Sequence, residues 1–261
     1  NLLARETEFS WPITELYSGW RWHWKIEYIN DVMQYHGFNV NIPVFNESQV
    51  KTVASMAQRT KMYRWAVRDC LKFNYAIEYP VHFGMTTKQD QEVFRLAALD
   101  ASKMNGAIVD LGSWMGSTAM CLAEGDPEAD IYAIDRYQFE DWMADNRQGE
   151  KLGYKVGDCF FKDAAENMSV HPNIKPVKAD IIEMEFDKDI KLLLVDAMKS
   201  TELCQKIVAE YFTRLTPGAM LVHQDFKHWF CPWIHILQYR LRKSFELVME
   251  ADYGGTLSFR L

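Results

Sequence analysis

Short apolar runs of strand length that alternate with helical segments constrain the fold of this chain more than any other feature of its sequence. Four such runs, each bounded by Gly, Asp or Pro, occupy residues 107–111, 131–134, 192–195 and 219–222. A continuous apolar run is typical of a parallel strand whose two faces are both covered by helices. The pattern therefore predicts a doubly wound α/β domain over residues 86–261.

The two ends of this predicted domain carry their own signals. Thr86 or Thr87 is placed to cap a helix that begins the domain. Near the other end, residues 245–249 and 256–261 have strand character and are separated by a short stretch that contains two glycines. We expect these two segments to form an antiparallel hairpin at the edge of the sheet.

Residues 1–85 differ from the rest of the chain. Four tryptophans crowd residues 11–24, and residues 48–75 carry apolar side chains at three- and four-residue steps, which is typical of a helix with one apolar face. We expect a helical, aromatic-rich extension that precedes the domain of residues 86–261. Three roles stay open for it: a lid over the substrate, a dimerisation arm, or aromatic packing against the main domain.

The composition excludes several classes of protein. The 261 residues include 36 acidic and 29 basic side chains, with a formal net charge of -7, which argues against a broad nucleic-acid-binding face. No apolar run approaches the roughly 18 residues that a membrane-spanning helix requires. The five cysteines show neither a CxxC pair nor a zinc-binding spacing, so we expect free thiols in a reducing compartment. We identify no secretory signal and expect a cytoplasmic protein.

The first predicted strand leads into the most informative stretch of the chain, residues 110–118. This stretch combines a strand end, a glycine turn and a helix start, as in nucleotide-type sites at the carboxyl edge of a parallel sheet. Gly112 and Gly116 allow the backbone to approach a ligand closely, because neither carries a Cβ. Their spacing is GxxxG rather than GxGxxG, so a nicotinamide dehydrogenase is disfavoured. Asp110 beside the turn disfavours phosphate and suits a cationic or hydroxyl-bearing ligand.

Further acidic residues follow the later predicted strands in order. Asp135 ends the second strand, Asp180 follows a short strand bounded by Pro, and Asp196 and Asp225 follow the fourth and fifth. Together with residues 110–118, these positions resemble the motifs of class I S-adenosylmethionine-dependent methyltransferases across the whole predicted α/β domain. The likeness is greatest to the macrocin-type sugar O-methyltransferases and looser to catechol and caffeoyl-CoA O-methyltransferases. It implies a Rossmann-like, mostly parallel seven-stranded sheet.

The resemblance also implies a binding site for S-adenosylmethionine at this edge of the sheet. By analogy with the family, Asp110 orients the amino group of the cofactor, Asp135 binds the ribose diol, and Asp180 lies at the adenine amino group. Arg136 lies beside the adenine, and Ile181 packs on its ring. The full set of implied cofactor-binding residues is Asp110, Gly112, Ser113, Gly116, Ser117, Thr118, Asp135, Arg136, Asp180, Ile181 and Asp196.

A divalent metal ion is a further implication of the resemblance. Such enzymes commonly hold it with one Asp after the fourth strand and an Asp-Asp or Asp-Asn pair after the fifth. The ion grips two substrate oxygens and lowers the pKa of the attacking hydroxyl, and oxygen ligands suit magnesium. Here Gln224 replaces the first acid of the pair. Metal dependence therefore stays open, with Asp196, Asp225 and Gln224 as the candidate ligands.

Without a metal ion, another group has to accept the proton of an attacking hydroxyl. Three candidate catalytic residues lie at or just after the ends of the fourth and fifth strands: Asp225, His223 and Lys199. A neutral imidazole at position 223 could serve as a base near physiological pH; the alternative is an inward-facing, structural histidine. Lys199 either orients the substrate or pairs with Asp196.

The sequence thus predicts an S-adenosylmethionine-dependent O-methyltransferase that acts on a hydroxyl of a small molecule, either a sugar or a natural-product intermediate. Two alternatives stay open. One is methyl transfer to nitrogen or carbon of a small molecule, and the other is a non-catalytic cofactor-binding or scaffold subunit, which Gln224 in place of an acid would suit. We expect no nucleic-acid or membrane partner, and a homodimer is the default assembly for an enzyme of this size.

Overall fold

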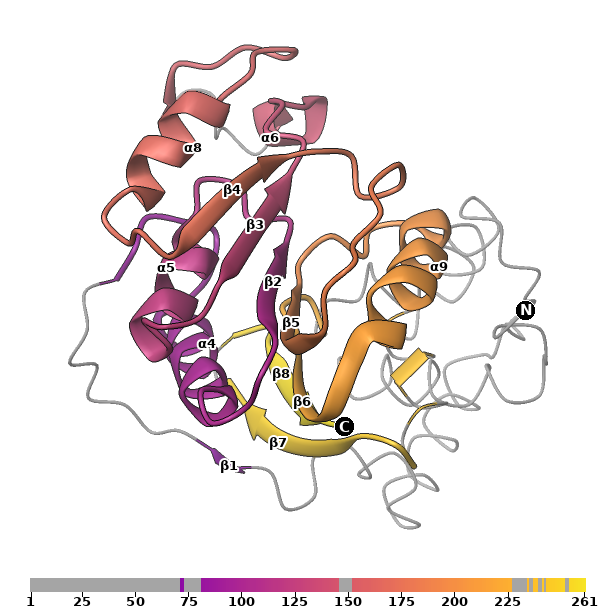
Figure 1. Cartoon of the computed structure of the whole chain (residues 1–261). Coiled ribbons are helices and arrows are strands. Elements are labelled where there is room, and N and C mark those ends of the chain that lie inside the picture. The colour runs from indigo at the N-terminus through magenta and orange to yellow at the C-terminus, as the bar shows by residue number, and fades with distance from the viewer. Residues whose placement is uncertain are drawn as a thin grey trace, which may run out of the picture.

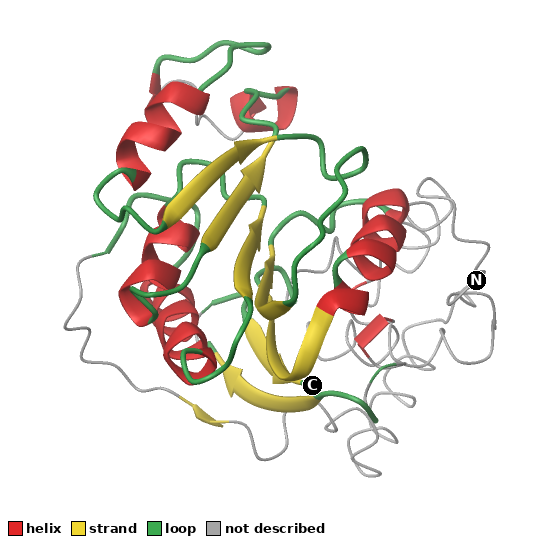
Figure 2. Cartoon of the chain, viewed as in Figure 1, coloured by secondary structure: helices red, strands yellow, loops and turns green. Residues whose placement is uncertain are grey.

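The computed structural model describes residues 71–72, 81–145, 152–226, 234, 237–238, 241, 243–251 and 254–261. These residues form one mixed β-sheet with helices on both of its faces (Figure 1, Figure 2). Most of the predicted N-terminal extension lies outside the described residues. Its helical character, its role and its boundary at residue 85 therefore stay predictions.

The sheet has eight described strands in the order β1-β7-β8-β6-β5-β2-β3-β4. The strands are β1 (Leu71–Lys72), β2 (Ala107–Leu111), β3 (Ile131–Asp135), β4 (Ile174–Lys178), β5 (Ile190–Val195), β6 (Leu215–His223), β7 (Glu246–Glu250) and β8 (Leu257–Arg260). Neighbouring strands run parallel, except that β8 is antiparallel to both β6 and β7. The predicted seven-stranded, mostly parallel sheet with an antiparallel hairpin is confirmed for β2 to β8, and β1 adds a two-residue strand beyond β7.

Helices flank this sheet on both sides (Figure 1). They are α4 (Lys88–Ala101), α5 (Ser117–Gly125), α6 (Asp141–Asp145), α8 (Phe161–Met168), α9 (Thr201–Glu210) and the 3-10 helix η3 (Phe212–Arg214). Thr87 caps α4: its hydroxyl oxygen accepts from the Asp90 N–H at 3.2 Å, and the Asp90 carboxylate accepts from the Thr87 N–H at 2.9 Å. The longest of these helices has 14 residues, and the described chain offers none with the length and apolarity that a bilayer crossing demands.

Two hydrophobic cores, one on each face of the sheet, explain why the central strands consist of continuous apolar runs. On β5, Leu192 and Leu194 pack on the side of α4 and α5, whereas Leu193 and Val195 pack on the side of α9. Because successive side chains of a strand point to opposite faces, each of these positions requires an apolar residue. The resulting register brings the carboxyl ends of β2, β3, β5 and β6 to one edge of the sheet.

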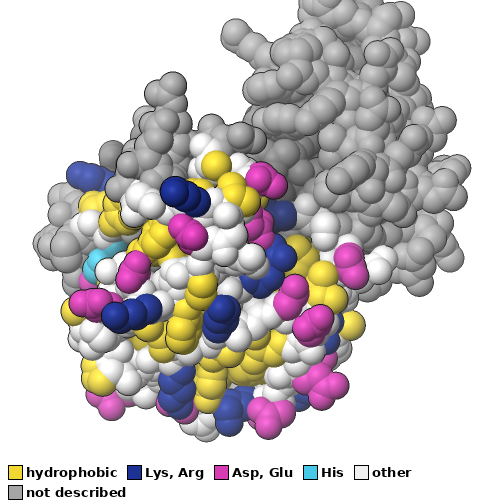
Figure 3. All heavy atoms as spheres, turned by 90° about the horizontal axis from the view of Figure 1, so that it is seen from above, with side chains coloured by type: hydrophobic (Ala, Val, Ile, Leu, Met, Phe, Trp, Pro, Cys, Tyr) yellow, Lys and Arg dark blue, Asp and Glu magenta, His cyan; other side chains and the backbone are white. Residues whose placement is uncertain are grey.

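The face toward which β3 and β4 point carries charges of both signs (Figure 3). Over its described part, Lys and Arg side chains alternate with Asp and Glu, and apolar side chains lie between them. Charges of both signs are therefore interspersed over the described part of this face.

Candidate functional site

Backbone hydrogen bonds hold the predicted site positions at one level of the sheet. Gly112, Asp196 and Gln224 each directly follow a strand. Their N–H groups donate to carbonyl oxygens of the neighbouring strands β3, β2 and β5 at 2.9, 2.9 and 3.1 Å. In the same way, the Ala179 N–H after β4 donates to the Asp135 carbonyl oxygen at 3.0 Å. These four hydrogen bonds therefore align the carboxyl ends of five strands, β2 to β6, at one level of the sheet.

The turn between β2 and α5 depends on glycine for its own packing. Gly112 and Gly116 both have φ of 90°, in the left-handed region that favours glycine. A Cβ on Gly112 would lie 2.9 Å from the Asp196 carbonyl oxygen, and one on Gly116 would lie 2.4 Å from Cγ of Met168. The two glycines thus allow the turn to sit against the end of β5 and against α8.

Asp110 is fully buried at the start of this turn, near the end of β2. The Thr118 hydroxyl donates to its Oδ2 at 2.5 Å, whereas its Oδ1 is buried and has no hydrogen-bond partner among the described residues. Burial, together with repulsion from Asp196 and Asp135, raises the pKa of Asp110 to about 8, although hydrogen bonds from the Thr118 hydroxyl and the Ala119 N–H lower it. A buried acceptor left without a donor is costly, so this oxygen is suited to a cationic donor from a ligand.

Asp135 shapes the same turn from the end of β3. Its Oδ2 accepts from the Trp114 N–H at 2.9 Å, and its Oδ1 accepts from the Tyr137 N–H at 2.7 Å. Burial raises the pKa of this carboxyl, and these two N–H groups lower it. Asp135 is only partly buried as a residue, and each carboxylate oxygen retains capacity for a second donor. It can therefore accept from a ligand hydroxyl.

The residues expected near the adenine lie in three different environments. Asp180 follows β4, and its Oδ1 accepts from the Ile182 N–H at 2.9 Å. Ile181 is buried in the core on the α9 side of the sheet. Arg136 is exposed and forms an ion pair with Glu140, four residues later. Asp180 and Arg136 are thus accessible beside the strand ends, whereas Ile181 contributes to the core.

Lys199 connects the two carboxylates that follow β5 and β6. Its Nζ donates to Asp196 Oδ1 at 2.8 Å and forms an ion pair with Asp225 Oδ2. Asp225 is 7% exposed, while the Lys199 side chain is 42% exposed. The structure therefore unites Lys199, Asp196 and Asp225 in one cluster, in which Lys199 is the most exposed side chain.

Gln224 belongs to a separate, buried cluster. Its side-chain amide oxygen lies 2.5 Å from the Thr256 hydroxyl, and that hydroxyl lies 2.6 Å from Asp90 Oδ1. Gln224, Thr256 and Asp90 are all at most 5% exposed. Of the three candidate metal ligands, Asp196 and Asp225 thus both contact Lys199. The third, Gln224, instead contacts Thr256 in the interior.

His223 also points into the interior. It is fully buried, with the rings of Phe212, Phe226 and Phe259 at 6.3, 6.2 and 6.2 Å. Neither ring nitrogen has a hydrogen-bond partner of normal geometry among the described residues. Burial lowers the pKa of His223 to about 4, against the opposing effect of the Gln238 side chain. The structure thus places this candidate base in an aromatic core, apart from the Lys199 cluster.

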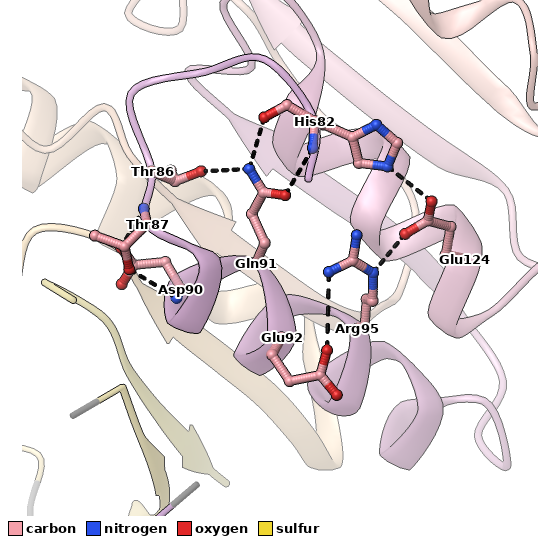
Figure 4. Close-up of polar contacts among 8 residues, drawn as sticks. All are labelled: His82, Thr86, Thr87, Asp90, Gln91, Glu92, Arg95 and Glu124. Carbon is pink, nitrogen blue, oxygen red and sulfur yellow. Dashed lines mark hydrogen bonds and ion pairs between the residues drawn. The ribbon is translucent and has the colours of Figure 1, made fainter. Parts of the chain in front are cut away.

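Residues 81–87, which the sequence analysis did not connect to the site, lie against the glycine turn. The Phe83 ring lies 5.7 Å from that of Trp114, and a Cβ on Gly84 would lie 2.3 Å from Oγ of Ser117. A network of polar contacts holds this segment (Figure 4): the Gln91 side chain bonds both backbone groups of His82, and the His82 ring contacts Glu124 at 2.7 Å. No local pattern signals these contacts, because His82 and Glu124 are 42 residues apart.

The same network includes a possible set of metal donors, formed by His82, Cys121 and Glu124, whose donor atoms lie within 4.8 Å of one another. Two observations disfavour a metal ion there. Arg95 Nε donates to Glu124 Oε2 at 2.5 Å and already supplies a positive charge (Figure 4). Burial raises the pKa of the Cys121 thiol and so disfavours the thiolate that a metal binds. We interpret this cluster as structural.

No protein-family model and no curated protein matches this chain. Among solved structures, the O-methyltransferase NovP is 12% identical, with a TM-score of 0.52 over 66% of this chain and 79% of that chain. A SAM-dependent O-methyltransferase from Thermotoga maritima is 14% identical, with a TM-score of 0.46 over 69% of this chain and 67% of that chain. The N-methyltransferase NodS from Bradyrhizobium japonicum is 14% identical, with a TM-score of 0.41 over 66% of this chain and 96% of that chain. The likeness to NovP shows the fold, and it confirms the prediction of a Rossmann-like methyltransferase fold.

Proposed function

We propose that this chain, which has the fold of the class I S-adenosylmethionine-dependent methyltransferases, transfers a methyl group from S-adenosylmethionine to a hydroxyl of a small molecule. The observation that carries the proposal is buried Asp110, with one carboxylate oxygen unpaired among the described residues and with Asp135 at the next strand end. S-adenosylmethionine presents an ammonium group, a sulfonium group and a ribose diol. These are suitable partners for such carboxylates.

The electrostatics of the strand ends support a cationic cofactor. Burial raises the pKa of Asp110 and of Asp135, and the negative charge of Asp196 raises both further. A positively charged ligand relieves this repulsion and favours the ionised carboxylates. Because burial raises the pKa of Asp110 to about 8, we expect cofactor binding near neutral pH to release a proton.

We assign Asp225 and Lys199 to the acceptor. The acceptor oxygen attacks the methyl carbon in line with the carbon–sulfur bond, which breaks; sulfur keeps the electron pair and becomes a neutral thioether. Asp225 takes the hydroxyl proton, and the Lys199 ammonium stabilises negative charge that develops on the oxygen. His223 has no part in this assignment, because aromatic side chains enclose its ring.

The acceptor class that we infer is a hydroxylated small molecule, either a sugar or a natural-product intermediate. This inference is supported by the resemblance of the strand-end residues to macrocin-type enzymes, and NovP, whose fold this chain shares, is itself an O-methyltransferase. We also propose a homodimer, on the frequency of such assemblies among enzymes of this size.

Calorimetric titration with S-adenosylhomocysteine tests the cofactor site. We expect binding to the wild-type protein and a loss of roughly tenfold or more in affinity for Asp135→Asn, the usual effect of removing a charged hydrogen-bonding group. Asp130→Asn is the matched control, because Asp130 precedes the same strand at its amino end and is 60% exposed. Repeating the titration in buffers of different ionisation enthalpy measures the proton released by Asp110. No binding to the wild-type protein, or equal binding by the two variants, would overturn the proposal.

Turnover with isotopically labelled methyl donor tests the reaction. We expect O-methyl products from a panel of hydroxylated sugars and phenols, and a strong loss of turnover with retained S-adenosylhomocysteine binding in Asp225→Asn. A labelled N-methyl or C-methyl product would instead support the other acceptor classes. Cofactor binding without turnover on any acceptor would favour a non-catalytic subunit.

A further inference from the structure

We propose that the Lys199 ammonium group takes the place of a divalent metal ion between Asp196 and Asp225, so that this site orients an acceptor oxygen without a metal. The role toward the acceptor rests on the proposed function. The exclusion of a divalent ion does not, since it follows from the arrangement of these side chains alone.

The first argument is the position of the ammonium group. Lys199 Nζ contacts Asp196 and Asp225, which are the two carboxylates that the sequence offers as metal ligands. A magnesium ion would require the same oxygens at about 2.1 Å. It would therefore have to displace the ammonium group, because two cations at adjacent positions repel each other.

The second argument is the engagement of the third candidate ligand. The Gln224 amide oxygen lies 2.5 Å from the Thr256 hydroxyl, which also contacts buried Asp90. Turning Gln224 toward Asp196 would leave buried polar groups of this cluster without partners. An acid at position 224 would instead place a second carboxylate beside Asp90, with one hydroxyl between them. A neutral amide suits this position, which gives a structural reason for the departure from the acidic pair.

The third argument is that the backbone around Lys199 fixes its position. The Lys199 N–H donates to the Ala197 carbonyl oxygen at 2.7 Å, which closes a tight turn after β5. The next residue, Ser200, caps α9 by accepting from the Leu203 N–H at 3.1 Å. An ammonium group carries three N–H donors. One donates to Asp196, a second faces Asp225, and in a side chain that is 42% exposed the third is available to an acceptor oxygen.

Binding of Mn²⁺, followed by electron paramagnetic resonance, tests the proposal on the full chain. We expect no stoichiometric binding by the wild-type protein at millimolar Mn²⁺. Lys199→Ala removes the ammonium group from between the two carboxylates and should gain a Mn²⁺ site, which a second substitution, Asp196→Asn, should remove. Lys199→Arg keeps a positive charge and should continue to exclude Mn²⁺.

Lys175→Ala is the matched control, because it frees a single exposed carboxylate, that of Asp130, and should gain no Mn²⁺ site. Thermal unfolding of each variant establishes that it is folded. One Mn²⁺ bound by the wild-type protein, displaced by Mg²⁺ and lost in Asp196→Asn, would overturn the proposal. Failure of Lys199→Ala to gain Mn²⁺ would overturn it as well.

Turnover separates this proposal from the proposed function. We expect wild-type turnover to persist in EDTA, and Lys199→Ala to lose turnover while its affinity for S-adenosylhomocysteine is unchanged. Turnover that disappears in EDTA and returns with Mg²⁺ would overturn the metal-free site and leave the methyltransferase proposal intact. Absence of S-adenosylhomocysteine binding would overturn the methyltransferase proposal, and the Mn²⁺ experiment would still decide the cation position.

Discussion

At the scale of the residue, burial moves the pKa values of Asp110 and His223 in opposite directions. It raises the pKa of Asp110 to about 8 and lowers that of His223 to about 4, since in each case burial favours the uncharged form. Asp110 sits beside other carboxylates at the strand ends, whereas His223 is surrounded by aromatic rings. The same physical effect therefore acts on a residue of the proposed binding site in one case and on a core residue in the other.

We expect His223 to make the folded protein less stable as the pH falls. Its pKa drops from 6.5 to about 4 on folding, so between these values the unfolded chain binds a proton that the folded chain does not. The free energy of unfolding is unaffected by this residue above pH 6.5 and falls by up to ~3 kcal/mol toward pH 4. Urea unfolding at pH 7 and pH 5 measures the loss. The loss of unfolding free energy between pH 7 and pH 5 should be smaller in His223→Leu than in the wild-type protein. In His171→Leu, a partly exposed control, it should equal the wild-type loss.

The sequence predicts the residues of the site where the signal is local. Asp110, Asp135 and Asp196 can be located because each lies at or next to the carboxyl end of an apolar run. The partners of Gln224 cannot be found in this way, since Asp90 and Thr256 are 166 residues apart and meet only in the folded chain. The orientation of His223 is likewise set by rings from three separate segments.

At the scale of the element, the N-terminus of α5 is set by close packing rather than by a side-chain cap. Gly116 occupies the N-cap position, where it has no side chain that could cap the helix. Its left-handed backbone lets the turn pass directly over Met168 at the end of α8. Helix α5 therefore begins where the chain can approach α8. A search of the sequence for Ser, Thr or Asp caps does not detect this helix start.

Gly116→Ala should destabilise the protein more than Gly157→Ala. Both glycines have similar φ values, 90° and 91°, so the backbone strain of an added Cβ is matched. The Cβ at position 116 would lie 2.4 Å from Met168 Cγ, whereas nothing lies within 4 Å at position 157. We expect an extra loss of about 1–3 kcal/mol in the free energy of unfolding from this overlap. Urea unfolding measures it, and equal losses in the two variants would show that packing on α8 is unimportant.

The buried, parallel character of the central strands is predictable, because helices cover both faces of the sheet and each strand is therefore a continuous apolar run. The apolar runs of β2, β3, β5 and β6 are found at the expected positions, and the structure extends β5 and β6 toward their amino ends. Pairing of β1 with β7 is not predictable from the sequence, since a two-residue strand carries no periodicity.

At the scale of the whole molecule, one buried cluster joins three distant parts of the fold. Asp90 belongs to the first turn of α4, Gln224 follows β6, and Thr256 precedes β8. Asp90 Oδ1 accepts from the Thr256 N–H at 3.1 Å and contacts its hydroxyl at 2.6 Å. The cluster thereby fixes the closing hairpin to the first helix of the α/β domain, next to the candidate site.

Gln224→Glu should weaken this connection although the two side chains have nearly the same shape. The new carboxyl would share the Thr256 hydroxyl with buried Asp90. We therefore expect the free energy of unfolding to fall by about 2 kcal/mol or more at pH 7. Repulsion raises the pKa of the added carboxyl above its unfolded value, so the loss should grow as the pH rises from 4 to 7. Gln138→Glu, on an exposed side chain, is the matched control. Thermal unfolding across this pH range measures the difference, and similar curves for the two variants would contradict the prediction.

The pairing of β1 with β7 bears on how the protein avoids aggregation. A strand at the edge of a sheet presents unpaired N–H and carbonyl groups, which can recruit a strand of another molecule. Leu71 and Lys72 pair with Met249 and Glu250, so a segment from early in the chain covers part of an edge formed late in the chain. A shortened chain that begins after residue 80 would leave this part of β7 unpaired and prone to intermolecular β-pairing. Residues 71–72 thus protect the sheet as well as extend it.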